Sequence, residues 1–213
     1  MLQVKTFCFS PFQENTYVVS DEVSNCVIID PGCYDAAEEQ ELSDYIRKAE
    51  LKPLHLLNTH GHVDHVFGNK YVAETYGLKP EIHRKDLPVL DSLLQVSRLY
   101  NLKAQASPQP GVFLEEGDQI RLGKSVLDIV FTPGHSPGSI CFICHPQQLV
   151  IGGDVLFRDS IGRTDLPGGD HETLLESIRK KLFTLPDDYT VYPGHGIPTT
   201  IGHEKKHNPF LNS

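Results

Sequence analysis

The segment "NTHGHVDH", residues 58–65, holds three of the chain's eleven histidines, and an aspartate stands between the last two. Side chains alternate along an extended backbone, so His60 and His62 can point the same way across Gly61. Asp64 and His65 follow at the predicted start of a helix, where neighbouring side chains point about 100° apart. Imidazole and carboxylate groups are common metal ligands. We therefore predict that this segment provides donors for two neighbouring cations.

Two cations need more ligands than one segment supplies, and three later donors each follow a predicted strand. His135 lies in "FTPGHSPGS", Asp154 in "IGGDVLF" and His195 in "VYPGHG". A rigid strand fixes such a side chain while the glycine-containing turn exposes it. These three residues are the candidate partners of the "HGHVDH" cluster. The other histidines lack this setting and are predicted to be structural or solvated: His55, His83, His145, His171, His203 and His207.

The elements that must position these donors follow from the apolar pattern. Strands are predicted at 2–9, 15–20, 26–32, 53–59, 80–84, 119–123, 126–132, 139–145, 148–153 and 190–193. Helices are predicted at 35–49, 64–76, 86–100 and 171–183, the third with Leu87, Leu90, Leu94 and Leu99 facing inward. Two strand-rich halves, each with helices, predict an α/β fold of two facing sheets with helices outside, a four-layer αββα sandwich. Residues 1–213 are predicted to form one domain, with the proline-containing loop 103–111 between its halves.

Composition excludes several classes of function. The formal charge of −9 argues against broad binding to nucleic acid. No apolar run reaches the ~20 residues of a membrane span, and the N-terminus alternates like a strand instead of resembling a signal peptide. We therefore expect a cytoplasmic protein that binds neither membrane nor nucleic acid.

The five cysteines form an odd set, which indicates reduced thiols. Cys141 and Cys144 make a C-x-x-C, a spacing that can bind zinc or carry redox chemistry. Here they lie in a predicted β-hairpin, where residues three apart point to opposite faces of the sheet. We therefore interpret them as structural.

The donor motifs together resemble a known family. "THGHVDH" is similar to the T-H-x-H-x-D-H motif of the metallo-β-lactamase superfamily, and "TPGHSPGS", "GGDVLF" and "YPGHG" match its later ligand motifs in order. Within that superfamily, "GDVLFRDSIGRTDLPGGD", "YPGHGIPTTIGHE" and "HNPFL" resemble the short glyoxalase II-like hydrolases. Full-length glyoxalase II enzymes add a helical domain that contacts glutathione, and we expect a short form without it.

The resemblance implies a site with two divalent metal ions, zinc in the first instance and iron or manganese as alternatives. It assigns His60, His62 and His135 to one ion, Asp64, His65 and His195 to the other, and Asp154 to both. The implied activity is hydrolysis of a small thioester of the S-lactoylglutathione type by a metal-bridging hydroxide, with Asp64 and Asp154 holding the ions in place for catalysis. A thioester suits this chemistry because its leaving thiol has a pKa of only ~8.5.

Substrate contacts are predicted on the loop after Asp154. Arg158, Ser160 and Arg163 could hold a carboxylate-bearing substrate. The alternative is that Arg163 pairs with Asp165 or Asp170 and braces the loop. Phe12 and Tyr34 could line the pocket, although such residues more often belong to a core or rim.

Other activities remain open. "GRTDL", residues 162–166, also resembles the persulfide dioxygenases of the superfamily, which use one iron held by two histidines and a carboxylate; here these would be His60, His135 and Asp154. Hydrolysis of lactones or RNA is a further alternative, as is a metal-binding module without catalysis. A structural zinc needs only four ligands, so a set of seven argues against the last.

Overall fold

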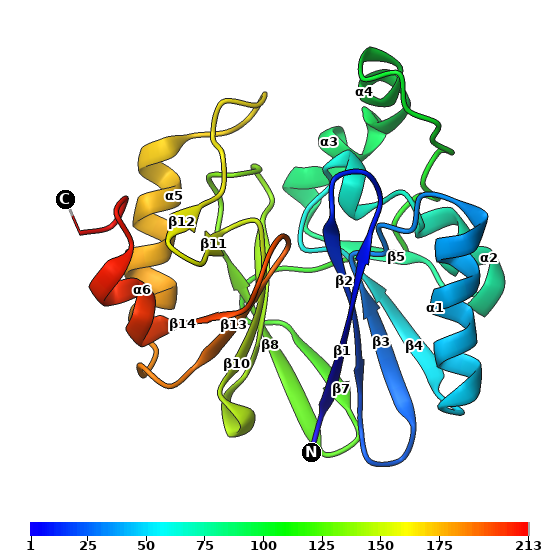
Figure 1. Ribbon diagram of the computed structural model, residues 1–213, viewed down its shortest axis with the longest axis horizontal. Helices are drawn as coiled ribbons and strands as arrows, with labels where there is room; N and C mark the ends of the chain where they lie inside the picture. The colour runs from blue at the N-terminus through cyan, green and yellow to red at the C-terminus, as the bar shows by residue number, and fades with distance from the viewer. Residues whose placement is uncertain (213) are drawn as a thin grey trace.

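The computed structural model describes residues 1–212 and contains two six-stranded sheets that face each other (Figure 1). The first sheet has the order β1-β2-β3-β4-β5-β6 and is built from Gln3–Phe9, Glu14–Ser20, Asn25–Ile29, Lys52–Leu57, Pro80–Ile82 and Val112–Phe113. β1, β2 and β3 pair antiparallel, whereas β3, β4, β5 and β6 pair parallel. The parallel part needs crossovers, and helix α1 (Ala36–Lys48) makes the one between β3 and β4.

The second sheet has the order β14-β13-β10-β9-β8-β7. Its strands, from β7 to β10 and then β13 and β14, are Gln119–Leu122, Ser125–Phe131, Ile140–Cys144, Leu149–Gly153, Thr190–Pro193 and Thr199–Thr200. β9 is antiparallel to both β8 and β10, and β13 is parallel to β10. The strands β8, β10 and β13 therefore run in the same direction and end at the same edge of the sheet.

Helices cover the outer face of each sheet, which completes the predicted four-layer order. In Figure 1, α1 and α2 (Asn69–Tyr76) lie outside the first sheet, and α5 (His171–Ser177) and α6 (Ile201–His207) outside the second. The short helices α3 (Leu87–Asp91) and α4 (Leu93–Leu99) stand at one end of the molecule. A small hairpin of β11 (Leu156–Phe157) and β12 (Ser160–Ile161) follows β10.

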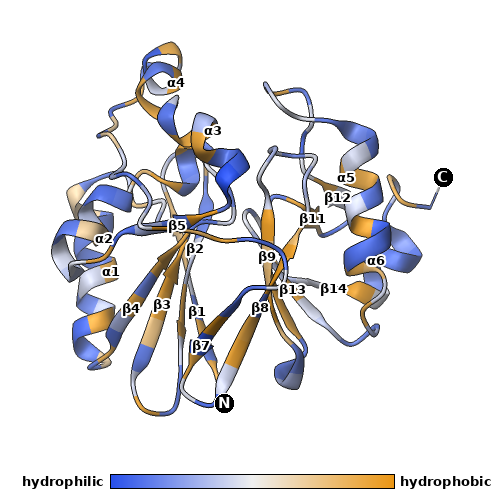
Figure 2. Cartoon of the chain, turned by 180° about the vertical axis from the view of Figure 1, so that it is seen from behind, coloured by the Kyte–Doolittle hydropathy of each residue, from blue (hydrophilic) through white to orange (hydrophobic). Residues whose placement is uncertain are grey.

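Three apolar layers hold the sandwich together, and hydrophobic residues accordingly concentrate on the strands in Figure 2. One lies between the sheets and includes Tyr17 and Phe142; a second packs α5 and α6 on the second sheet; a third packs α1 and α2 on the first. Cys144 belongs to the layer between the sheets and Cys141 to the layer under α5. The prediction that these two thiols face opposite sides of the sheet is confirmed.

Two predicted helices differ in the structure. The helix expected at 64–76 is a 3₁₀ turn, Val63–His65, followed by α2. Gly68 precedes α2 as its N-cap and leaves no room for a side chain, because a Cβ there would lie 2.2 Å from Cys33 Sγ. The helix expected at 86–100 is α3 and α4, which meet at Ser92. Of its four leucines, Leu90 is buried, but Leu94 and Leu99 are exposed, so the prediction that all four face inward was wrong.

The closing helix begins at His171 as α5, and residues Ile178–Leu182 continue it as a π-helical turn. Asp170 caps its start and accepts a hydrogen bond from Thr173 N. Among residues 1–212, no helix combines the length and the apolar character that a membrane crossing requires.

Candidate metal centre

The candidate donors gather where strands of both sheets end. His60 follows β4, while His135, Asp154 and His195 follow β8, β10 and β13. The 3₁₀ turn after β4 carries Asp64 and His65. The structure therefore brings all seven donors named from the sequence to one place.

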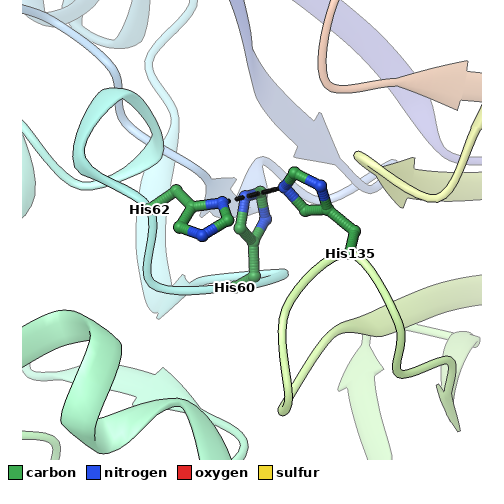
Figure 3. Close-up of side chains that lie close together, drawn as sticks. All are labelled: His60, His62 and His135. Atoms are coloured by element: carbon green, nitrogen blue, oxygen red, sulfur yellow. Dashed lines mark hydrogen bonds between the residues drawn. The ribbon is translucent and has the colours of Figure 1, made fainter. Parts of the chain in front are cut away.

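Three of these donors form a compact group. His135 Nε2 lies 2.8 Å from His62 Nδ1 and 3.2 Å from His60 Nε2. The three rings come from two loops and point toward one another (Figure 3). Their nitrogen atoms lie within 4.8 Å of one another, close enough to hold one ion.

A second group of three donors lies beside the first. Its members are Asp64, His65 and His195, whose ligand atoms are also within 4.8 Å of one another. Asp64 Oδ2 is 3.1 Å from His195 Nε2 and 3.8 Å from His65 Nε2.

The carboxylate of Asp154 lies between the two groups. Its Oδ2 is 3.5 Å from His135 Nε2 in the first group and 3.6 Å from His195 Nε2 in the second. Its Oδ1 is 3.4 Å from His65 Nε2. Asp154 can therefore contact ligands of either group.

The outer nitrogen atoms of four histidines have fixed partners. His135 Nδ1 faces the carbonyl of Arg163 at 2.7 Å and His195 Nδ1 that of Phe12 at 3.1 Å. A carbonyl only accepts, so both Nδ1 atoms carry the proton. His65 Nδ1 faces the carboxylate of Asp30 at 3.1 Å.

His60 is held in the same way by Thr59. The hydroxyl of Thr59 donates to Asp30 and therefore accepts from His60 Nδ1 at 3.0 Å. With their protons on Nδ1, His60, His65, His135 and His195 direct unprotonated Nε2 atoms at the centre when neutral, which is the form that binds metal.

Buried atoms without partners indicate that the donors fit cations. Among residues 1–212, three buried side-chain atoms have no hydrogen-bond partner: Glu14 Oε1 behind His65, and the two atoms that face the centre, His65 Nε2 and Asp154 Oδ1. Buried polar atoms are normally satisfied. An ion between these donors would satisfy the two atoms that face the centre.

The pKa values divide the histidines into two kinds. Burial lowers the pKa of His60 well below its usual value and that of His62 to about 3, so both are neutral. Burial also disfavours a charge on His65, but Asp154 and Asp64 outweigh it and raise its pKa. For His195 the hydrogen bond to Asp64 likewise overcomes burial and raises the pKa.

The two carboxylates of the centre stay ionised. Burial alone would raise the pKa of Asp154 and Asp64, but the neighbouring His65 lowers both below the usual value. The metal-free centre therefore combines two carboxylates of lowered pKa with two histidines of raised pKa, His65 and His195, and two of lowered pKa, His60 and His62.

Three further carboxylates support the centre, and the sequence analysis missed them. Asp30 accepts hydrogen bonds from Thr59 N at 2.7 Å and from its hydroxyl, and it contacts His65. Glu14 is fully buried and its Oε1 lies 3.8 Å from His65 Nδ1; burial raises its pKa well above the usual value. An acidic residue directly after the apolar run "CVII" was a signal for Asp30.

Asp86 joins the two loops of the first histidine group. Its carboxylate accepts from Gly61 N at 2.5 Å, between His60 and His62, and from Gly138 N at 2.6 Å. It also accepts from the hydroxyl of Ser136, next to His135, at 2.6 Å. No local pattern identified Asp86, since its partners lie 25 to 52 residues away.

The predicted substrate contacts have different surroundings. Ser160 and Arg163 line the cavity over the centre, as does Phe12. Arg163 makes two hydrogen bonds of 2.7 Å to Asp165, the bracing pair given as the alternative. Arg158 lies 3.9 Å from Asp159 and outside the cavity lining.

Tyr34, the other pocket candidate, also lies outside the lining. Its ring packs against Phe67, and its hydroxyl accepts from Lys103 N at 2.9 Å. Tyr34 therefore packs on Phe67 and does not line the cavity.

A second donor cluster outside this centre consists of Asp159, His203 and Glu204. Glu204 is fully buried and accepts hydrogen bonds from Asp159 N, Asn208 and the hydroxyl of Thr199. His203 Nε2 lies 2.7 Å from Asp159 Oδ1. These contacts fasten α6 to the β11–β12 hairpin.

Comparison with known sequences gives a family match over most of the chain. The model described as the metallo-beta-lactamase superfamily matches residues 9–195. The hydroxyacylglutathione hydrolase GloC of Haemophilus influenzae is 39% identical over 100% of this chain and 99% of its own length. A Bacillus subtilis protein named "Probable metallo-hydrolase YqgX" is 41% identical over 95% of this chain and 94% of its own.

Solved structures agree with the fold. The BLEG-1 B3 metallo-beta-lactamase superposes with a TM-score of 0.91 at 36% identity, covering 99% of this chain and 100% of that one. TTHA1623, solved in a di-iron-bound form, has a TM-score of 0.87 at 38% identity, covering 98% of this chain and 100% of that one.

Proposed function

Since this chain belongs to the metallo-beta-lactamase superfamily, we propose that it hydrolyses thioesters of the S-lactoylglutathione type with two divalent metal ions. It is a metallo-hydrolase of that superfamily with a histidine-rich candidate metal site. The observation that carries the finer proposal is a pair of three-donor groups with Asp154 between them, in a chain similar over its full length to a hydroxyacylglutathione hydrolase.

We assign the donors as two sets that share one carboxylate. His60, His62 and His135 would hold one ion, and Asp64, His65 and His195 would hold the other, with Asp154 available to both. Ions bound there supply a Lewis acid for the thioester carbonyl and lower the pKa of water from near 16 toward ~7. Zinc is the proposed metal, while the di-iron form of TTHA1623 makes iron an alternative.

The chain's own residues orient the reaction. His135 and His195 are held by backbone carbonyls through Nδ1, which keeps their lone pairs on the centre. Asp64 is hydrogen-bonded to His195 and lines the cavity floor with Asp154. The leaving thiolate has a pKa of ~8.5 and departs without a strong general acid.

A cysteine nucleophile is not part of this proposal. Burial raises the pKa of the Cys26 and Cys141 thiols to about 12. Among the described residues, no cysteine lines the cavity. Water is therefore the proposed nucleophile.

The test is loss of thioester absorbance when zinc-loaded protein meets S-lactoylglutathione. Asp64→Ala and His62→Ala should each lower turnover at least about a hundredfold at saturating metal, because each removes a donor from a different group. A matched change outside the centre, His171→Ala, should keep wild-type turnover. Wild-type activity in Asp64→Ala or His62→Ala would refute the assignment.

The rival activity, a mononuclear iron persulfide dioxygenase, would use His60, His135 and Asp154. These three are also close together, since His135 Nε2 lies 3.2 Å from His60 Nε2 and 3.5 Å from Asp154 Oδ2. One ion there would give no role to the second converging group, Asp64, His65 and His195, whose ligand atoms also lie within 4.8 Å of one another, and this favours the two-ion proposal. Oxygen uptake by iron-loaded protein on glutathione persulfide, without thioester hydrolysis, would establish the rival.

A further inference from the structure

Helices α3 and α4 present apolar side chains to a cavity as well as to the core. Leu90 and Leu93 pack with Val66 in a small buried cluster. Leu99 and Tyr100 at the end of α4, by contrast, are 78% and 56% exposed. Large exposed apolar side chains on one element mark a contact surface.

These helices form one wall of a cavity of about 890 Å³ over the metal centre. The wall, which we call the α3–α4 stripe, consists of Val89, Leu93, Val96, Leu99 and Tyr100. On α4, Leu93, Val96 and Leu99 follow one another at intervals of three residues, and Tyr100 lies four residues after Val96, so these residues share one side of the helix. In Figure 1, α4 rises on one side of this end of the molecule and the segment before α5 on the other.

The opposite wall is also apolar. Leu166 and Pro167 line it from the segment before α5, and Phe157 lines it from β11. The candidate ligands His62, Asp64, His135, Asp154 and His195 line the same cavity. The apolar walls are therefore continuous with the proposed site of reaction.

Few free charges line these walls. Arg163 is paired with Asp165 through two hydrogen bonds. Lys85 lies at the base of α3, with its ammonium 4.8 Å from the centre of the Phe131 ring. Such a lining suits an uncharged, apolar group with at most one anion near Lys85.

We propose that the α3–α4 stripe binds an apolar acyl chain of the thioester, so that the preferred substrates are medium-chain acyl thioesters. This inference rests on the proposed thioesterase function and adds its substrate class. The thiol carrier of a thioester is polar and charged and would need several polar partners. The apolar wall, with Lys85 near its base, therefore fits the acyl group on the other side of the scissile bond. The stripe thereby makes Val96 and Leu99 specificity-determining residues.

The first test is a chain-length series on zinc-loaded protein. Acetyl, butanoyl, hexanoyl and octanoyl thioesters of glutathione are compared with S-lactoylglutathione by kcat/KM. Each methylene buried on the stripe should raise kcat/KM roughly two- to fourfold. We expect hexanoyl to exceed acetyl by at least about tenfold. Equal values along the series, with S-lactoylglutathione hydrolysed, would overturn this inference and leave the proposed function standing; no hydrolysis of any member would overturn both.

Variants test whether the stripe causes the preference. In the double variant Val96→Ser, Leu99→Ser, the hexanoyl-to-acetyl ratio should fall at least about fivefold, since two apolar contacts are lost. Leu94→Ser is the matched control, because Leu94 is on the same helix, 37% exposed and outside the cavity lining. An equal fall in the control would contradict a role for the stripe.

A binding measurement needs no catalysis. The chain contains no tryptophan, so Tyr100→Trp introduces a single reporter at the end of the stripe. S-octylglutathione, a thioether that cannot be hydrolysed, should shift the emission to the blue, whereas S-methylglutathione should not. A reporter outside the cavity lining, Phe210→Trp, should show no shift with either ligand. The same response to both thioethers at Tyr100→Trp would contradict an acyl-chain site.

Discussion

Hydrogen bonds behind the histidines decide which nitrogen faces the proposed metal ions. Thr59, Asp30 and two backbone carbonyls take the Nδ1 protons, so the Nε2 lone pairs converge without a change of rotamer. The seven donors were recognisable in the sequence because each stands in a short local motif. Asp86 and Glu14 were not, because their roles depend on contacts between distant segments.

Asp86 provides a test at the residue scale. In Asp86→Asn, only one side-chain oxygen remains to accept the three hydrogen bonds that the carboxylate now accepts. The new NH₂ group would face the N–H of Gly61 or of Gly138, so two donors would meet. The affinity for zinc should fall roughly 10- to 100-fold, as for other residues behind metal ligands. Titration against a coloured chelator measures it. Asp91→Asn, an exposed aspartate on the neighbouring turn of α3, serves as control and should bind zinc like the wild type.

Proton release provides a second test. In the metal-free protein the pKa values of His65 and His195 are raised, whereas those of His60 and His62 are lowered, so His65 and His195 hold a proton more firmly than His60 and His62 do. Zinc must displace the protons, and its affinity should therefore rise with pH, about tenfold per unit for each proton released. Calorimetry at about pH 6, below the ordinary histidine pKa of ~6.5, in buffers of different ionisation enthalpy should show release of up to two protons. A binding enthalpy that is independent of buffer would contradict this.

At the scale of elements, the strand ends were predictable and the helix breaks were not. An apolar run that stops at a glycine turn predicts where a strand ends, and His135, Asp154 and His195 follow such runs. The need for a glycine at position 68, just before α2, depends instead on the close approach of Cys33 and Pro31 in another loop, which no local pattern reports. The stripe on α4 has the periodicity of a buried helix, so the sequence could not distinguish a cavity wall from a core face.

Gly194 tests how closely the elements approach at the centre. A Cβ there would lie 2.1 Å from Asp154 Oδ1 and 2.7 Å from His65 Cε1, so Gly194→Ala must displace donors of the site. We expect turnover to fall at least about a hundredfold and stability by about 1–3 kcal/mol. At Gly152 a Cβ would make an ordinary contact of 3.4 Å with Val191, so Gly152→Ala should fold and turn over nearly normally. Similar turnover in the two variants would argue that the donors beside Gly194, Asp154 and His65, are not needed for the reaction.

At the scale of the whole molecule, the order of the layers was predictable, because each strand-rich half forms a sheet and each sheet must bury both of its faces. Residues of both sheets, such as Val27 and Ile129, share one core layer. We therefore propose that residues 1–213 are one cooperative domain.

Metal removal should lower the stability of that domain. The proposed ions bind donors from both sheets and only the folded chain presents them together, so each ion at 100 times its Kd adds about 2.7 kcal/mol. Chelation should lower Tm by on the order of 10 °C, in one transition, and zinc should restore it. His171→Ala should retain the full shift and His62→Ala should lose part of it. A Tm unaffected by chelation would exclude stabilising ions.

The central claim is that the seven donors hold two ions in the active protein. The most direct measurement is activity on S-lactoylglutathione as zinc is added stepwise to metal-free protein, with bound zinc counted on the same samples. We predict that turnover reaches its maximum at two ions per chain, and that anomalous scattering places one ion among His60, His62 and His135 and the other among Asp64, His65 and His195. Full turnover at one ion per chain, with no gain from a second, would contradict the account.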